Sequence, residues 1–444
     1  MHIDITLADG VVLTGDGNYT ISYDKLFSKY FDANLSTVHV KNGKLVLTTS
    51  ANTRGFYVHE ATTVNGRAGG ALLDNMLVTV NPQATAADSN LSRLMTELDN
   101  QINQNTASGK AAANTIMAAA AGATVTTLNA AQLGTQERNM RAIRNRTVTM
   151  GIDPSVVQQD LPYWNAWASF NGANSDISQN GDQPGYKLSS WGGTIGADSD
   201  ISRHITLGVA FTANYGKLTA TGADTASGHV DSYLASLYLR GQSGKWSHVG
   251  ILTGGTAKAD LDRTVNYGAG QYKTSGTTDG SSFGAMYELA YDIALDTDYK
   301  SLVQPLFNAS LNSARMKGYT ETGAGNANLS VENMDTTYGT VGVGGRYIAS
   351  VGQNLFNRTA TLEARAMLLQ DIGDRQVEAD VAFADAKGYK RTVEGIKPGS
   401  TGVEVGLGLT IPVELQSSIF MEINLDARSR STEVSGGIGY RYNF

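Results

Sequence analysis

The sequence predicts an all-β transmembrane barrel of about 12 antiparallel strands, plugged by an N-terminal α-helix and preceded by a short β-solenoid-like segment. Three observations predict the barrel. Apolar and polar side chains alternate from about residue 162 to residue 444, the connections between these runs are alternately short and long, and charged residues are few. Only 17% of the 444 residues are charged, against roughly 25% in a typical soluble chain.

Composition also excludes several classes of protein. The chain has no cysteine, which rules out disulfide scaffolds, cysteine-based zinc sites and thiol catalysis. Its net charge of -7 disfavours a nucleic-acid binder, because such proteins normally present a basic face. The mean hydropathy is slightly negative, so the chain is not a bundle of membrane helices. We therefore expect no nucleic-acid partner.

Residues 1–84 are predicted to form short strands and turns. Val38 and Val40 alternate with polar residues before the Asn42-Gly43 step, and residues 45–47 are apolar after it. This pattern is typical of a β-hairpin or of a corner in a β-coil, and the segment is similar to the last rungs of a β-solenoid. The opening sequence MHIDITLADG lacks the basic and apolar regions of a secretion signal. We therefore expect the chain either not to be exported or to begin after a removed segment.

Residues 85–158 are predicted to be helical. Ser89 is a suitable N-cap for a first helix, and Asn105 to Gly109 is expected to end that helix. Its apolar side chains recur at helical spacing and predict one buried face. They are Leu91, Leu94, Met95, Leu98 and Ile102.

A second, alanine-rich helix is expected to follow and to continue to Arg146. Its uncharged stretch, residues 111–136, contains threonine, asparagine and glutamine, which disfavour insertion into a bilayer. A helix enclosed by the rest of the protein fits this composition better than a membrane-spanning one.

The last turns of the second helix carry four arginines, Arg138, Arg141, Arg144 and Arg146. Cations near a helix C-terminus are favourable because of the helix dipole, and that effect alone accounts for them. The alternative is that they pair with acidic residues of a surrounding barrel.

The remainder of the chain is predicted to form twelve strands. In the clearest of them, apolar side chains from Phe283 to Ile293 alternate with small, polar and charged ones. Each strand has about the ten residues that a tilted strand needs to cross a bilayer. The strands are centred on 163–170, 186–197, 205–214, 230–240, 245–257, 283–293, 302–314, 337–348, 359–369, 402–414, 418–427 and 432–444.

Alternation by itself also fits a soluble β-sandwich, and two features of the connections and strand ends favour a membrane. Short connections such as 241–244 alternate with long polar ones, as in outer-membrane barrels. The long ones are 172–185, 217–228, 258–281, 315–335 and 371–400. Aromatic residues near the strand ends predict an interfacial girdle. They are Tyr163, Trp164, Trp167, Trp191, Tyr440 and Tyr442.

The polar face of the strands is the third feature. It is rich in glycine and alanine, which a face in open water does not need but a lumen that holds something does. It also carries isolated charged residues, which we predict to line the lumen. These are Glu288, Asp292, Arg346, Glu363, Arg365, Glu404, Glu422 and Asp426.

The last strand places four apolar or aromatic residues on one face, namely Ile438, Tyr440, Tyr442 and the terminal Phe444. This arrangement resembles the signal by which the outer-membrane barrel assembly machinery recognises its substrates.

Taken with these features, the chain resembles the translocator unit of classical, type V autotransporters. The resemblance is carried by WASFNGA, GGTIGADSDISRHITLGVAFTANYGKL, SLVQPLF, YGTVGVGGRY and GIGYRYNF. In that family a secreted passenger, commonly a β-solenoid, precedes a helical linker and a C-terminal barrel of twelve strands. The helix threads the pore, and assembly of the barrel is coupled to export of the passenger.

The resemblance implies that residues 1–84 are the end of a passenger, 85–158 the linker and pore helix, and 159–444 the barrel. It implies a monomer in the bacterial outer membrane that exports its own passenger and displays it on the cell surface. Its partners would be the outer-membrane lipid bilayer, the barrel assembly machinery and that passenger. The acidic lumen residues would then surround Arg138, Arg141, Arg144, Asn145 and Arg146 of the pore helix.

No catalytic, metal or cofactor site is predicted. The six histidines are scattered without metal-ligand spacing, and no nucleophile elbow, Walker A loop or dinucleotide motif is present. Some classical autotransporters cut their own linker at an asparagine pair. Here Asn129, Asn139 and Asn145 occur singly, so self-cleavage is not expected, and Asn145 is the nearest candidate for it.

Two other functions stay open as alternatives. One is an outer-membrane channel or adhesin-type barrel without an export role, although a diffusion channel needs an open lumen and residues 110–150 supply a plug. The other is a surface hydrolase, which needs a histidine beside a carboxylate in the long loops. Those loops offer His229 with Asp224 or Asp231.

Overall fold

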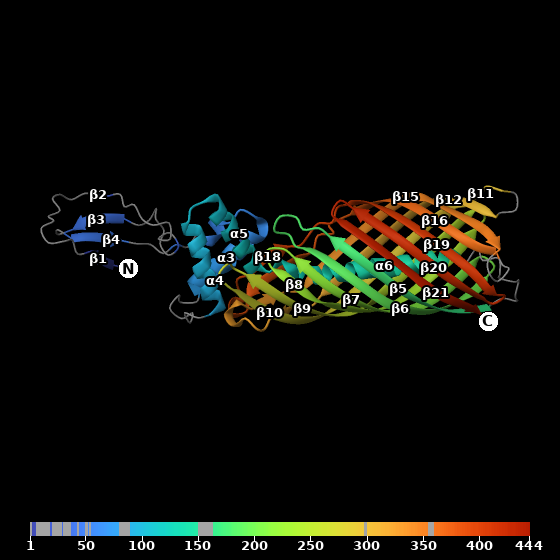
Figure 1. The fold of residues 1–444 in the computed structure, drawn as a ribbon, viewed down its shortest axis with the longest axis horizontal. Helices are drawn as coiled ribbons and strands as arrows, with labels where there is room; N and C mark the ends of the chain where they lie inside the picture. The colour runs from blue at the N-terminus through green and yellow to red at the C-terminus, as the bar shows by residue number, and fades with distance from the viewer. Residues whose placement is uncertain are drawn as a thin grey trace.

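A computed structural model gives the fold of the chain (Figure 1). It describes residues 2–5, 18–19, 29, 37–41, 44–48, 52, 55–79, 89–149, 163–296, 300–353 and 359–444. A long barrel holds a helix along its axis, and a group of helices covers one mouth of the barrel. The C-terminus lies at the opposite end of the barrel from these helices.

The barrel consists of twelve antiparallel strands and is closed, as the sequence predicts. Closure joins Tyr440 of the last barrel strand to Ala168 of the first, and the sixth barrel strand pairs with the seventh. The strands are β5 (Tyr163–Ile177), β6 (Gly185–Ser202), β7 (Ile205–Thr221), β8 (Thr225–Ser243), β9 (Trp246–Asn266), β10 (Gln271–Tyr291), β12 (Ser301–Met316), β15 (Met334–Gln353), β16 (Thr359–Ile372), β19 (Thr401–Glu414), β20 (Ser417–Arg428) and β21 (Ser431–Asn443). A two-residue strand, β11 (Ile293–Ala294), pairs with β12.

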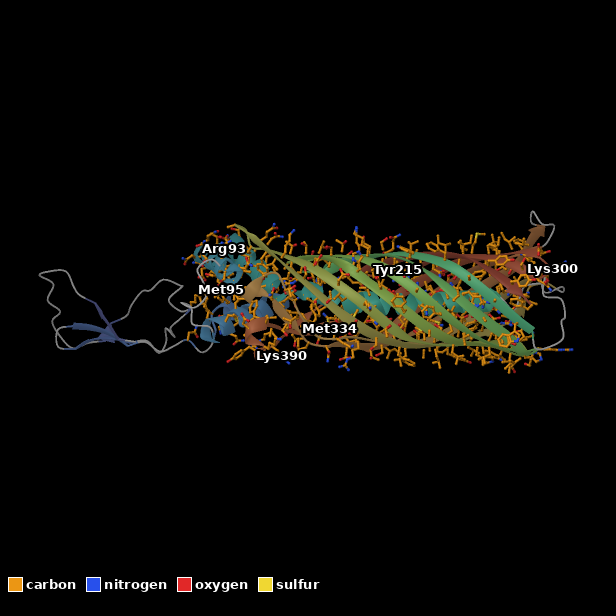
Figure 2. The ribbon with its side chains drawn as sticks, turned by 90° about the horizontal axis from the view of Figure 1, so that it is seen from below. Arg93, Met95, Tyr215, Lys300, Met334 and Lys390 are labelled. Atoms are coloured by element: carbon orange, nitrogen blue, oxygen red, sulfur yellow. The ribbon has the colours of Figure 1, made fainter. Side chains whose placement is uncertain are left out.

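The outer wall carries an apolar belt, which we define as the exposed apolar side chains of the barrel strands. On β7 the belt runs from Ile205 to Tyr215 and gives way to Lys217, and Figure 2 shows Tyr215 on this wall, part-way along the barrel. Eleven residues of a tilted strand give the apolar band of about 25 Å that outer-membrane barrels present to lipid. Other members of the belt are Phe170, Ile195, Leu237, Leu252, Phe283, Leu311, Val343, Leu368, Leu407, Ile423 and Ile438.

The prediction of long loops at 172–185, 217–228 and 258–281 was wrong. Strands fill half of the first range and most of the other two, so that β9 continues to Asn266 and β10 begins at Gln271. Beyond the belt the outward side chains are polar, which makes the sequence resemble a loop. The inward ones, such as Leu218, Val230 and Leu261, are buried against the helices.

The two remaining excursions, 315–335 and 371–400, do leave the barrel wall. They contribute a separate four-stranded sheet in the order β13-β14-β17-β18, whose apolar residues Leu329, Val381, Phe383 and Val393 are fully buried. Its strands are β13 (Tyr319–Thr320), β14 (Leu329–Val331), β17 (Glu378–Phe383) and β18 (Arg391–Glu394), with short 3-10 turns at Gly325–Ala327 and Ala384–Ala386.

The helices before the barrel form a cap on this mouth (Figure 1). The cap consists of α2 (Tyr57–Glu60), α3 (Val64–Thr79), α4 (Asn90–Asn103) and α5 (Ala107–Ala121). The side chain of Ser89 accepts from the Ser92 amide at 3.2 Å and Leu91, Leu94, Leu98 and Ile102 of α4 are buried, which confirms the predicted cap and apolar face. Asp74 of α3 accepts from the backbone amides of Phe56, Tyr57 and Val58 at 2.8, 2.9 and 3.0 Å and so holds α2 in place.

The alanine-rich helix is not continuous, contrary to the prediction. After α5, Gly122 has φ +70, a left-handed conformation that favours glycine, and a 3-10 turn (Ala123–Thr126) leads into α6 (Thr127–Thr149). Among the described residues no single helix has the length and hydropathy to span a membrane, and only the two segments Ala107–Ala121 and Ala123–Thr147, bent by 45°, pass that test together.

The described part of residues 1–84 differs from a solenoid end in two respects. Strands β1 (His2–Ile5), β2 (Asn18–Tyr19), β3 (Thr37–Lys41) and β4 (Lys44–Thr48) pair antiparallel in the order β1-β4-β3-β2, which confirms the hairpin but not stacked rungs. Tyr57–Glu60 and Val64–Thr79 are helical rather than extended. Helix α3 packs tightly on α5, since a Cβ added at Gly69 would be 1.8 Å from the Met117 carbonyl oxygen.

Candidate functional site: the plugged lumen

Helix α6 runs along the inside of the barrel (Figure 1) and packs against β6 to β10, β12 and β15. Arg138, Arg141 and Arg144 are spaced three residues apart, so they lie on one side of the helix. Arg141, Arg144, Asn145 and Arg146 are all less than a tenth exposed. The four arginines at the end of the second helix therefore lie inside the lumen, not in solvent at a free helix end.

The three arginines on one side of α6 bind acidic residues of the wall. Arg138 Nη1 lies 2.7 Å from Glu433 Oε2, and Arg141 lies 3.3 Å from both Glu433 and Asp426. These contacts link the middle of the helix to β20 and β21, next to the seam where the barrel closes.

Arg144 continues this row toward the C-terminal end of α6. It pairs with Glu404 of β19, and its Nε lies 3.6 Å from Glu288 of β10. Glu288 also accepts from Arg346 Nη1 at 2.7 Å. Each of these four charged groups is buried and has a charged partner, as burial in a low-dielectric interior requires.

Arg146 points to a different part of the wall. Its Nη2 lies 2.7 Å from Asp198 Oδ2, and its guanidinium stacks over the Trp167 ring at 4.2 Å from the centroid. Tyr238 completes this group, since its hydroxyl donates to Asp198 at 2.7 Å and accepts from Trp167 Nε1 at 2.9 Å. Glycine is required at position 208, because an added Cβ would lie 2.2 Å from the Tyr238 ring.

Asn145 is held by polar side chains of two nearby strands, β16 and β20, which both flank β19. Its Nδ2 donates to Glu422 Oε2 at 2.7 Å and to Asn424 Oδ1 at 3.0 Å. Its Oδ1 accepts from Arg365 Nη1 at 2.5 Å, and Arg365 in turn pairs with Glu363. The amide group is thus fixed from both ends.

Of the eight residues predicted to line the lumen, five contact α6 directly. These are Glu288, Arg365, Glu404, Glu422 and Asp426. Arg346 and Glu363 are buried and reach the helix through Glu288 and Arg365. Asp292 lies directly after β10 and binds Gln242 and Gln304 instead of the arginines.

Several functional residues were missed. Glu433 and Asp198 both contact α6, and the period of two gives the signal for each. Glu433 is an even number of residues from the buried Arg441 and therefore shares its inward face. Asp198 is an odd number of residues from the exposed Trp191 and therefore also faces inward. Trp167 was predicted in the interfacial girdle but is buried in the lumen. It is three residues from the outward-facing Trp164, so the two side chains lie on opposite faces of the strand.

A second buried ion cluster, which we call the hinge cluster, holds the bend between α5 and α6. It consists of Arg263, Glu321, Asp224 and Thr124. Arg263 donates to both oxygens of Glu321 at 2.8 Å and to the Ala119 carbonyl, at the end of α5, at 3.1 Å. The hydroxyl of Thr124 donates to Asp224 Oδ2 at 2.5 Å. Burial raises the pKa of Asp224, and the nearby Arg263 opposes that rise.

The histidine considered for a surface hydrolase, His229, pairs with a carboxylate that was not predicted beside it. His229 lies 3.4 Å from Asp260 on the exposed wall, whereas Asp224 is buried in the hinge cluster. Within the described ranges, no group of three histidine, aspartate or glutamate residues is placed to hold a metal ion.

The four residues of the predicted assembly signal lie on β21. Ile438 and Tyr440 are about half exposed on the outer wall. The ring of Tyr442 contacts that of Phe444 at 5.1 Å, and the Tyr442 hydroxyl donates to Gln416 at 3.1 Å. This outward apolar face lies on the strand that closes the barrel against β5.

Comparison with known proteins identifies the family. Residues 166–424, more than half of the chain, match the model of the autotransporter beta-domain. This chain belongs to the autotransporter β-domain family. Its barrel is therefore the outer-membrane translocator of an autotransporter.

Two curated relatives match part of this chain. Esterase EstA of Pseudomonas aeruginosa and its namesake in Pseudomonas putida are each 26% identical over 258 residues, which is 57% of this chain and 38% of theirs. The chain thus spans well under half the length of these curated relatives. The translocator domain of NalP from Neisseria meningitidis has the same fold, with a TM-score of 0.52, 16% identity, and coverage of 70% of this chain and 97% of that one. The transport unit of AIDA-I from Escherichia coli is 14% identical with a TM-score of 0.43, over 67% of this chain and 97% of that one.

Proposed function

We propose that this translocator anchors as a monomer in the outer membrane and displays its own passenger on the cell surface, with α6 left in the lumen as a plug. The row of buried pairs from Arg138–Glu433 to Arg144–Glu404 carries the proposal. Both partners of each pair are buried, and either one alone would be an uncompensated charge. Such a wall fits a permanent occupant better than an open diffusion channel.

The connections of the barrel support one orientation of the chain in the membrane. The excursions that form the β13-β14-β17-β18 sheet lie at the cap end, and Figure 2 shows Lys390 at that end and Lys300 at the other. In outer-membrane barrels the longer connections face the exterior and the short turns face the periplasm. The cap therefore faces the cell exterior in this proposal.

The outward apolar face of β21 supports one further partner. Ile438, Tyr440 and Phe444 present side chains to the bilayer side of the closing strand, where the barrel assembly machinery would meet an unfinished sheet edge. We include that machinery among the partners on this ground.

Labelling of engineered cysteines in intact cells tests the proposal, because the chain has no cysteine of its own. Arg93→Cys lies in the cap, and Lys300→Cys lies at the opposite end of the barrel (Figure 2). A membrane-impermeant maleimide is expected to label the first and spare the second, and both should react after the cells are permeabilised. Labelling of Lys300→Cys alone in intact cells would overturn the orientation and the export of the cap.

We also propose that the described barrel is not an enzyme and does not cut its own linker. Cleavage at Asn145 would require Nδ2 to attack the backbone carbonyl carbon of the same residue. Here both hydrogens of that amide are taken by Glu422 and Asn424, and α6 continues past Asn145 to Thr149.

We therefore expect the membrane-assembled protein to run as one intact band on a denaturing gel. A barrel fragment that begins after Asn145, and that disappears in Asn145→Gln, would contradict this prediction. Asn129→Gln serves as the matched control, since Asn129 lies on the same helix and binds two backbone carbonyls.

A further inference from the structure

The outer wall of the barrel contains a groove that interrupts the apolar belt. It crosses β7 to β10 and β12 and has a volume of ≈ 540 Å³, within the usual range for small-molecule sites. Its floor includes Gly250 and Ala285, and its walls include Leu239, Leu252 and Tyr287. A Cβ added at Gly250 would meet no atom within 4 Å, so the floor is open toward the bilayer.

The groove arises because small side chains are paired across neighbouring strands with large ones. Gly250 lies opposite Leu239 on one side and Tyr287 on the other, and Ala285 lies opposite Leu252. On β6 and β7, by contrast, Ile195 and Phe211 face each other and are both about half exposed or more. The depression is therefore local to one side of the belt.

One end of the groove is polar. Tyr287 is 43% exposed, and its hydroxyl lies 2.7 Å from Nδ1 of His248. Polar groups that face lipid are costly unless they have a function or a partner. Trp246 and Tyr291 contact each other at 4.9 Å at the adjacent strand ends and mark the membrane interface there.

This geometry suits a lipid whose head lies at the interface and whose chain runs along the wall. When the Tyr287 hydroxyl donates to Nδ1 of His248, the imidazole proton is on Nε2, which can then donate to an ester or phosphate oxygen. The apolar walls supply the close contacts that hold a hydrocarbon chain, since dispersion is the main attraction between apolar surfaces within a bilayer.

We infer that this groove binds one acyl chain of a diacyl phospholipid, with the ester or phosphate oxygens of that lipid at His248 and Tyr287. The groove is continuous with the belt that the barrel presents to the membrane, so lipid is the occupant that meets it. In the orientation proposed above, the site lies in the periplasmic leaflet. Its existence requires the outer-membrane barrel but not the export of a passenger.

Native mass spectrometry of the full chain, released from nanodiscs of phosphatidylethanolamine, tests the inference. Gly250→Leu fills the groove, and Gly193→Leu is the matched control, because Gly193 lies on the outer wall away from the groove with its nearest neighbour 3.7 Å from an added Cβ. We expect wild type and Gly193→Leu to retain one phospholipid in most molecules. Gly250→Leu should bind it roughly tenfold more weakly, which corresponds to about 1.4 kcal/mol.

His248→Phe together with Tyr287→Phe tests the polar end, and this double variant should lower retention while leaving the groove open. Heat-dependent gel migration verifies that every variant forms a folded barrel. Equal lipid retention by Gly250→Leu and Gly193→Leu would overturn the inference. So would a wild-type dimer that Gly250→Leu dissociates without loss of lipid, since a second copy would then be the occupant. The readout is independent of the cysteine labelling, so failure of one experiment is distinguishable from failure of the other.

Discussion

Replacement of Arg141 and Arg144 together by alanine is expected to open the lumen to ions. Each substitution removes a buried cation and leaves its acidic partners, Glu404 and Asp426, without full compensation. Breaking a buried pair in this way costs about 3–5 kcal/mol, because the remaining charge stays desolvated. Water and ions then replace the missing guanidinium groups, and α6 loses its ion pairs with β19 and β20.

Planar-bilayer recordings of the purified barrel measure this effect. We expect small conductance for the wild type, a severalfold increase for the double variant, and a further increase after deletion of residues 110–150. Arg315→Ala is the control, since its ion pair with Asp335 is 3.6 Å long and exposed, and such pairs contribute about 0–1 kcal/mol. A large wild-type conductance that does not change in the deletion variant would show that α6 does not plug the pore.

Much of the barrel could be predicted from the sequence, because the lipid outside and the lumen inside together impose an alternation with a period of two residues. Lipid requires apolar side chains at every second position, and the lumen requires small or paired ones at the positions between them. Phe283 and Tyr287 of β10 therefore face outward and Glu288 inward, as their parity predicts. Each of the twelve predicted strands coincides with one barrel strand, and only 245–257, 283–293 and 432–444 extend past its ends, by one or two residues.

The alternation of apolar and polar residues no longer identifies strands beyond the end of the apolar belt. Beyond the belt, β8, β9 and β10 have polar outward side chains, and their composition resembles that of a loop. The inward residues Val230, Leu261 and Tyr272 are apolar because helices of the cap cover them, and those helices are more than a hundred residues away in the sequence. Strand length at this end is thus fixed by tertiary packing rather than by local pattern.

The residues that form the lumen site could be predicted from the sequence, but the pairs that they form could not. Parity identifies which charges face the lumen, but the rotation of α6 decides which arginine meets which acid. Arg146 illustrates the limit, since it lies beside Arg144 in the sequence but binds Asp198 on β6, away from Glu404. The bend at Gly122 was also not evident, because the alanine-rich sequence favours helix on both sides of it.

Replacement of Arg263 by methionine is expected to detach the cap from the barrel mouth. The substitution keeps a long side chain but leaves Glu321 and Asp224 buried without their cation. It also removes the donor to the Ala119 carbonyl at the end of α5. We expect a loss of about 3–5 kcal/mol in the stability of the cap, seen as faster hydrogen exchange in α5 while exchange in the barrel strands is unchanged.

The pH dependence of this variant distinguishes buried charge from lost packing. Burial already raises the pKa of Asp224 above the ordinary value of 3.8, and Arg263 is the largest influence that lowers it, so the pKa rises further in Arg263→Met. An acid whose pKa is raised on folding stabilises the folded state at low pH, and that contribution is lost as the pH rises through the raised pKa. The defect in hydrogen exchange should therefore shrink as the pH falls toward 3.8, and it should grow toward neutral pH.

Neutralising the acids provides the matching rescue. Arg263→Met combined with Asp224→Asn and Glu321→Gln should recover much of the protection of α5 at neutral pH, because no uncompensated charge is then buried. Lys258→Met, an exposed substitution on the same strand, should change stability by less than about 0.5 kcal/mol. A defect of Arg263→Met that is equal at all pH values, and that the added substitutions do not repair, would mean that packing around the Arg263 side chain, rather than its charge, holds the hinge.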